Sequence, residues 1–163
     1  MSEHREPLSA LTGRLAERLL AKGLKVCTAE SCTGGLIAKT FTDLAGSSAW
    51  FERGFVTYSN QAKMDLLSVS EATLRADGAV SLETALQMAA GALANSAADV
   101  AVSVTGIAGP DGGSEEKPVG TVCFGFAIGD RVDAERCLFS GDRAAVREQS
   151  TRHAIEGLLA RLG

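Results

Sequence analysis

The segment that decides the predicted fold is Thr28-Ala29-Glu30-Ser31-Cys32-Thr33-Gly34-Gly35 (28–35). A strand predicted over 24–28 leads into it, and residues 36–41 place apolar side chains at helical intervals. The segment is therefore predicted to turn a strand into a helix, and if this is an ordinary connection, Thr33 is the helix N-cap. Open α/β sheets bind their ligands at the carboxyl ends of such strands, where Ser31 would lie.

Two interpretations of this turn fit the local pattern. In the first, the unpaired N–H groups at the start of the helix attract an anion, and Gly34 and Gly35 let the ligand approach the backbone. In the second, the turn is an ordinary strand-to-helix connection. The pattern within the segment favours neither interpretation over the other.

The remaining elements predict an α/β chain. Strands are expected over 50–58, 100–104, 120–128 and 132–139, and helices over 7–22, 34–44, 61–67, 71–76, 82–95 and 143–162. Asn60, Ser70 and Ser81 are the predicted N-caps of the three middle helices. This order predicts a three-layer α/β/α sandwich on a mixed, mainly parallel sheet, in one domain spanning 1–163.

Composition excludes several classes of protein. Hydrophobic residues make up 45% of the chain and charged residues 22%, and no apolar run approaches the roughly 18 residues of a membrane span. The net charge of −4 argues against general binding of nucleic acid. Two histidines and four cysteines without a Cys-x-x-Cys pair make a metal site improbable. We expect a cytoplasmic protein with free thiols.

Three loops are predicted to meet at one edge of the sheet: 30–35, 58–63 and 105–113. Ser31 is the natural nucleophile, although no Gly-x-Ser-x-Gly elbow surrounds it. His4 and His153 lie in a tail and inside a helix, so neither suits a catalytic triad. A serine nucleophile here needs another base, and lysine is the known substitute.

Lys63 is the candidate base. With Asn60 as N-cap it would occupy the third helical position, where the macrodipole opposes a positive charge and lowers the pKa of the amine. A solvated lysine fits the spacing as well. Tyr58 could relay a proton or simply end an amphipathic strand. Arg143 and Arg147, one helical turn apart, could together bind a phosphate or form ion pairs with nearby acidic side chains.

Seven motifs together resemble one family, the CinA C-terminal domain family. They are TAESCTGG (28–35), AGSSAW (45–50), GFVTYSN (54–60), GAVS (78–81), SVTGIAGPDGG (103–113), KPVGTV (117–122) and FSGDR (139–143). The resemblance covers nearly the whole chain, and it implies an α/β/α sandwich. Many family members carry a second, N-terminal nucleotide-processing domain, and this sequence resembles the stand-alone form.

The resemblance implies hydrolysis of the carboxamide of nicotinamide mononucleotide to nicotinate mononucleotide and ammonia, in pyridine nucleotide recycling and without a cofactor. Ser31, Tyr58 and Lys63 match the positions that carry the chemistry. The residues expected to bind substrate are Glu30, Thr33, Gly34, Gly35, Thr105, Gly106, Gly109 and Arg143. Glu30 is expected to position Lys63 or a water, or else to face solvent.

Two alternatives belong to other classes. The same pocket could bind a nucleotide without turning it over, or the chain could be an interaction domain in DNA uptake or repair. The latter predicts a basic stripe with interleaved aromatic residues, whereas aromatic residues make up 5% of this acidic chain. A homo-oligomer, with a dimer favoured, completes the expectations from the sequence.

Overall fold

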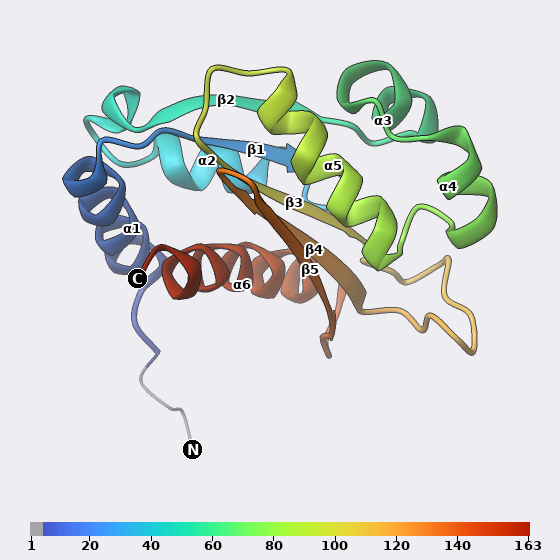
Figure 1. Cartoon of the computed structure of the whole chain (residues 1–163). Coiled ribbons are helices and arrows are strands. Elements are labelled where there is room, and N and C mark those ends of the chain that lie inside the picture. The colour runs from blue at the N-terminus through green and yellow to red at the C-terminus, as the bar shows by residue number, and fades with distance from the viewer. Residues whose placement is uncertain (1–4) are drawn as a thin grey trace.

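The computed structural model of the protein describes residues 5–163, so His4 lies outside the described residues. Five strands form one sheet in the order β2-β1-β3-β4-β5 (Figure 1). The strands are β1 (Val26–Glu30), β2 (Phe51–Val56), β3 (Val100–Gly106), β4 (Thr121–Ile128) and β5 (Arg131–Leu138). The helices are α1 (Leu8–Lys22), α2 (Leu36–Thr42), α3 (Asn60–Leu67), α4 (Glu71–Asp77), α5 (Leu82–Ala94) and α6 (Arg143–Leu162), with a short 3-10 helix η1 (Ser47–Ala49).

The sheet is mixed. β1 pairs in parallel with both β2 and β3, whereas β4 pairs antiparallel with both β3 and β5. β4 therefore runs against the other four strands, and the predicted mixed, mainly parallel sheet is confirmed. The central strand β3 is buried along nearly its whole length, as its continuous apolar run predicts.

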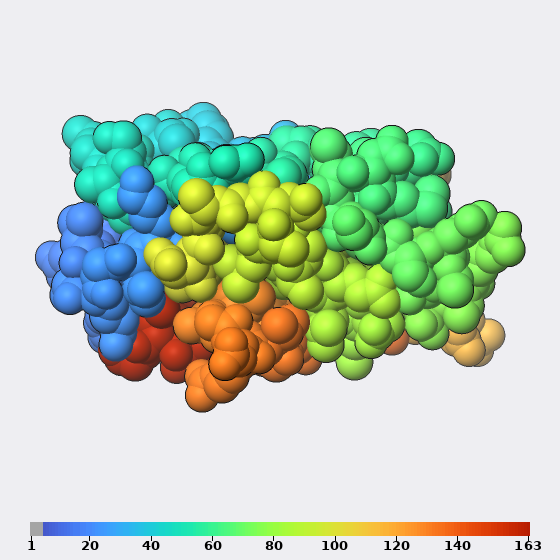
Figure 2. Space-filling view, turned by 45° about the horizontal axis from the view of Figure 1, so that its top comes forward, coloured from blue at the N-terminus to red at the C-terminus, as the bar shows by residue number. Residues whose placement is uncertain are grey.

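Helices cover both faces of the sheet. α1, α2 and α6 lie on one face and α5 on the other, while α3 and α4 extend beyond the end of β1 (Figure 1). In the space-filling view of Figure 2, α5 lies between the hairpin of β4 and β5 and the segment that holds α3 and α4. Each face has its own apolar cluster, the larger one under α1, α2 and α6. This arrangement is the predicted three-layer sandwich.

Close packing sets the position of α3, the helix that carries Lys63. A Cβ atom added to Gly91 of α5 would lie 1.8 Å from the carbonyl oxygen of Leu67, the last residue of α3. The missing side chain thus lets the two helices approach backbone to backbone. Leu67 is itself buried in the cluster on this face.

Two of the three predicted N-caps are confirmed. The hydroxyls of Ser70 and Ser81 accept hydrogen bonds from backbone N–H groups in the first turns of α4 and α5. Asn60 is not a cap, because the hydroxyl of Ser59 accepts from Ala62 N at 3.0 Å and starts the helix one residue earlier. None of the helices in residues 5–163 combines the length and the apolar character that a membrane crossing requires.

Candidate active site

A cavity of about 300 Å³ opens where the three predicted loops meet, at the carboxyl ends of β1 and β3. Its volume is at the lower end of the range of small-molecule sites. The loops contribute both the polar and the apolar parts of its wall. The lining residues are Ser31, Cys32, Tyr58, Asn60, Lys63, Ala79, Val80, Thr105, Gly106, Ile107, Ala108, Gly109, Asp111, Gly112 and Arg143.

Ser31 and Lys63 are hydrogen-bonded inside this cavity. Lys63 Nζ lies 3.0 Å from Ser31 Oγ, and it donates a second hydrogen bond to the carbonyl oxygen of Thr57 at 2.9 Å. The lysine side chain is 1% exposed. Because Ser59 caps α3, Lys63 takes the fourth helical position, not the third that an Asn60 cap would give. A nucleophile and a base within hydrogen-bond reach are the minimum for nucleophilic catalysis.

Burial prepares the amine to act as a base. It lowers the pKa of Lys63 below the ordinary value of 10.5, since removal from water disfavours the charged form, while the neighbouring Cys32 opposes this change. Among residues 5–163, no carboxylate lies within 4.0 Å of the amine to restore its charge. A lowered pKa was expected from desolvation or from the field at the helix start, and burial is the main cause.

The carboxylate of Glu30 binds the start of α2, and Glu30 does not line the cavity. Its fully buried carboxylate accepts hydrogen bonds from Thr33 Oγ1 at 2.6 Å, Ile37 N at 2.9 Å and Ala38 N at 3.0 Å. The expectation that it positions Lys63 or a water, or faces solvent, is therefore wrong. The anion at this helix start is the protein's own carboxylate, which satisfies the orphan N–H groups.

The predictions for Thr33, Gly34 and Gly35 also need correction. α2 begins at Leu36 with Gly35 as N-cap, so Thr33 is not the cap. Thr33 is fully buried, and its hydroxyl donates a hydrogen bond to the carboxylate of Glu30. Thr33, Gly34 and Gly35 do not line the cavity, and their proposed contact with an anionic ligand has no support in the geometry.

Tyr58 and Arg143 meet at the mouth of the cavity. Arg143 Nη2 donates to the hydroxyl of Tyr58 at 3.2 Å, and Nη1 donates to the carbonyl oxygen of Gly109 at 2.8 Å. In the part of the chain that the structure describes, Tyr58 is bonded to neither Ser31 nor Lys63. Its side chain is 64% exposed. The predicted proton relay through Tyr58 is thus not formed here.

Thr105, Gly106 and Gly109, which are expected to bind substrate, line the cavity. The hydroxyl of Thr105, however, donates to the carbonyl oxygen of Ala79 at 2.8 Å, so its proton is engaged within the protein. Two backbone N–H groups of the turn are also engaged within the protein. Ser31 N donates to Val104 O at 2.9 Å, and Gly34 N donates to Ser31 O at 3.0 Å.

Of the two alternatives for Arg143 and Arg147, the structure does not form the phosphate clamp, because the two guanidinium groups lie in different places. Arg143 lines the cavity, whereas the guanidinium of Arg147 donates to the carbonyl oxygens of Cys32 and Thr33 behind the turn. Two residues of the site were not predicted: Thr57 acts through its carbonyl oxygen, which leaves no side-chain signal, and Asp111 is one acid in an acidic loop. His153 contacts the carboxylate of Glu135 on β5, away from the cavity.

All four cysteines are free, with Cys27, Cys32 and Cys123 buried. Burial raises the pKa of the Cys32 thiol to about 11, so this neighbour of Ser31 is protonated near neutral pH. Within residues 5–163, no three side chains of His, Cys, Asp or Glu group closely enough to hold a metal ion.

Comparisons with known proteins agree on one family. The family model described as CinA C-terminal domain matches residues 8–162. The Escherichia coli protein named nicotinamide-nucleotide amidohydrolase PncC is 58% identical over 153 residues, covering 93% of this chain and 92% of that protein. A protein of the same name from Enterobacter agglomerans is 60% identical over 160 residues, covering 98% and 96%. The crystal structure of the competence/damage inducible protein CihA from Agrobacterium tumefaciens superposes with a TM-score of 0.93 at 49% identity, covering 98% of each chain.

Proposed function

The chain belongs to the CinA C-terminal domain family, and we propose that it is an amidase that converts nicotinamide mononucleotide to nicotinate mononucleotide and ammonia, in the recycling of pyridine nucleotides. Two relatives that match nearly the whole chain are named nicotinamide-nucleotide amidohydrolases. The observation that carries the proposal is the 3.0 Å contact between Ser31 Oγ and the buried amine of Lys63. A binding module without catalysis has no need of such a pair.

The first half of the proposed reaction forms an ester on Ser31. Neutral Lys63 Nζ removes the hydroxyl proton while Ser31 Oγ attacks the carboxamide carbon. When the carbon–nitrogen bond breaks, the lysine returns that proton to the departing nitrogen, and ammonia leaves. The bond from Lys63 to Thr57 O holds the amine in place through both transfers.

The second half releases the acid. Lys63 takes a proton from a water molecule, whose oxygen adds to the ester carbon, and then protonates Ser31 Oγ as the carbon–oxygen bond breaks. The product carboxyl group ionises, and the enzyme returns to its starting state. In a rival route Ser31 only orients a water that Lys63 activates, and no ester forms.

Substrate binding is assigned to the mouth of the cavity. Arg143 is the arginine of the lining, whereas Lys63, its other basic residue, is the neutral base of the proposed reaction and contacts Ser31. Arg143 is therefore proposed to bind the 5′-phosphate, since a guanidinium donates several hydrogen bonds to a phosphate in a fixed geometry. Tyr58, which accepts a bond from Arg143, is proposed to contact the substrate there and not to relay protons.

The test is ammonia release from nicotinamide mononucleotide by the purified protein, with Ser31→Ala as the comparison. Turnover that depends on Ser31 supports the amidase. Saturable binding of the nucleotide without turnover would instead make the chain a binding module. Near-normal turnover by Ser31→Ala would exclude both the route through an ester on Ser31 and the route through a water oriented by Ser31.

Hydroxylamine separates the two routes. An ester on Ser31 is intercepted by hydroxylamine, so the hydroxamate should accumulate at the expense of nicotinate mononucleotide while ammonia release continues. The direct-water route predicts no such partition, because it contains no acyl intermediate.

Nicotinamide riboside, which lacks the phosphate, tests the binding assignment. The wild-type protein should use the riboside less efficiently than the mononucleotide, because the guanidinium of Arg143 is left without its partner. Arg143→Ala should reduce this preference mainly by raising KM for the mononucleotide. Equal efficiency with both substrates in the wild-type protein would refute the phosphate site.

We further propose a cytoplasmic location, supported by the four free cysteines, and a homo-oligomer. The oligomer is tested by sedimentation equilibrium. A monomer at every concentration would refute it.

A further inference from the structure

We propose, building on the amidase activity proposed above, that Arg147 is a positioning residue for Ser31. It secures the turn that carries the nucleophile from the side opposite the substrate. Through that turn it keeps Ser31 Oγ within hydrogen-bond reach of Lys63.

Arg147 binds two consecutive carbonyl groups of the turn. Its Nε donates to Cys32 O at 3.2 Å and its Nη2 donates to Thr33 O at 3.0 Å. Cys32 and Thr33 directly follow Ser31 in the chain. A planar guanidinium can hold both oxygens at once, which restricts the rotation of the peptide planes between them.

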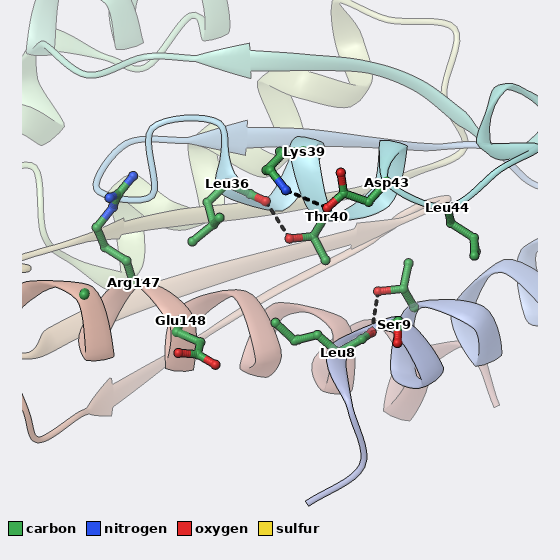
Figure 3. Close-up of a pocket in the computed structure, with 11 residues that line it drawn as sticks. Leu8, Ser9, Leu36, Lys39, Thr40, Asp43, Leu44, Arg147 and Glu148 are labelled. Carbon is green, nitrogen blue, oxygen red and sulfur yellow. Dashed lines mark hydrogen bonds and ion pairs between the residues drawn. The ribbon is translucent and has the colours of Figure 1, made fainter.

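Arg147 lies outside the substrate cavity. It lines a separate groove between α1, α2 and α6, together with Leu8, Leu36 and Glu148. Figure 3 shows its side chain reaching from α6 to the loop ahead of α2. Any effect of Arg147 on the reaction therefore passes through the turn and not through contact with substrate.

Side chains add to the backbone hydrogen bonds that hold this turn, which leave the carbonyl oxygens of Cys32 and Thr33 to Arg147 or to Leu36 N. Gly34 and Gly35 both have positive φ angles, 57° and 103°, and glycines in this region carry no side chain to hold them there. The carboxylate of Glu30 secures the start of α2 at one end of the turn. Arg147 secures the carbonyl groups next to Ser31.

Lys63 is held independently of this turn. It sits on α3, its amine donates to Thr57 O, and α3 packs against α5 at Gly91. A shift of the turn would therefore change the distance between Ser31 Oγ and the amine, because Lys63 would not follow. Misplacement by about 1 Å can cost about a hundredfold in rate.

The experiment compares Arg147→Ala with Arg152→Ala. Arg152 is a matched control, since it lies on the same helix and also donates to a backbone carbonyl, that of Glu6 at 2.8 Å. We expect Arg147→Ala to lower kcat by about ten- to a hundredfold with little change in KM. Arg152→Ala should keep the wild-type kcat. Methylguanidinium at concentrations that do not denature the protein should restore part of the activity of Arg147→Ala.

A second readout does not need the proposed substrate. The rate at which a fluorophosphonate probe labels Ser31 reports the activation of its hydroxyl, and it should fall in Arg147→Ala and recover with methylguanidinium. If the wild-type protein is labelled but releases no ammonia, the proposed substrate is wrong while the role of Arg147 is still decided by labelling. Wild-type protein that is neither active nor labelled would overturn the role of Ser31 and with it that of Arg147.

Three further outcomes overturn the proposal. They are a folded Arg147→Ala protein with wild-type kcat and labelling, equal losses in Arg152→Ala, and a loss in Arg147→Ala that appears in KM alone. If Arg147→Ala does not fold, Arg147→Lys takes its place. A single ammonium cannot hold both carbonyl groups in the same geometry, so kcat should again fall. An unchanged kcat in Arg147→Lys would count against the proposal.

Discussion

Lys63 Nζ lies 3.0 Å from Ser31 Oγ, although 32 positions separate the two residues in the chain. The serine follows β1 and the lysine is carried by α3, so the fold brings together a nucleophile and a base from different layers. The same packing removes the amine from water and lowers the pKa of Lys63. The packing of α3 therefore both brings the amine to the serine hydroxyl and lowers the pKa of the amine.

The first prediction concerns the pH dependence of activity. Because neutral Lys63 is the base, activity should rise with pH through its lowered pKa, below 10.5. Lys63→Ala should remove this ascending limb and reduce kcat by about 10²- to 10⁴-fold. Lys63→Arg should do the same, since a guanidinium stays charged. Steady-state rates measured across pH provide the check, and a limb that survives in Lys63→Ala would assign it to another group.

The free energy of unfolding should also depend on pH through Lys63. The pKa of Lys63 is lower in the folded protein than in the unfolded chain, so between the two values the unfolded chain binds more protons and stability rises with pH. Lys63→Met lacks this contribution. The stability of Lys63→Met relative to wild type should therefore be greatest at low pH, and it should fall as pH rises toward 10.5, because wild type gains stability over this range.

Urea denaturation at several pH values measures this difference. Lys39→Met, at an exposed lysine of α2, controls for the loss of a lysine as such. A difference between Lys63→Met and wild type that stays constant with pH would contradict the prediction.

Cys32 should be dispensable for catalysis. Burial raises the pKa of its thiol to about 11, so at neutral pH it is protonated and a poor nucleophile. Cys32→Ala should keep most of the activity, and iodoacetamide should inactivate the wild-type protein slowly. If Cys32→Ala is folded but as inactive as Ser31→Ala, the thiol is the nucleophile.

Glu30→Gln should destabilise the protein by about 2 to 4 kcal/mol, because the NH2 group of the glutamine side chain, a donor, would face one of the two backbone N–H groups that the carboxylate now satisfies. Glu148→Gln, at an exposed position on α6, should change stability by less than about 0.5 kcal/mol. Chemical denaturation of both variants tests this. Equal stability of Glu30→Gln and wild type would refute the role of the carboxylate.

Two glycine substitutions test the packing that positions Lys63. Gly91→Ala would place Cβ 1.8 Å from Leu67 O, so it should cost about 3 kcal/mol or more and lower activity by displacing α3. Gly13→Ala meets no neighbouring atom inside α1 and should stabilise the protein by about 0.5 to 1 kcal/mol. Thermal melts of both variants provide the measurement, and a stable Gly91→Ala protein would contradict the close approach.

The sequence by itself determined the order of the elements and the location of the site. The apolar run of 100–104 indicated a central strand, the turn of 28–35 indicated a strand–helix junction, and the bounds predicted for the last helix, 143–162, match α6. These features are local: periodicity, glycine content and capping hydroxyls act between residues a few positions apart. The motifs carried the resemblance to the family, which the comparisons confirm.

Only the tertiary structure decided what the charged side chains do. Glu30, Arg143 and Arg147 were all candidates for the site, yet Glu30 binds the N–H groups at the start of α2 and Arg147 binds the turn, which leaves Arg143 at the cavity. Local spacing could not separate them, because the partner of a charged group is chosen by packing between distant segments. For the same reason the main cause of the lowered pKa of Lys63, its burial in the folded chain, has no local sequence signal.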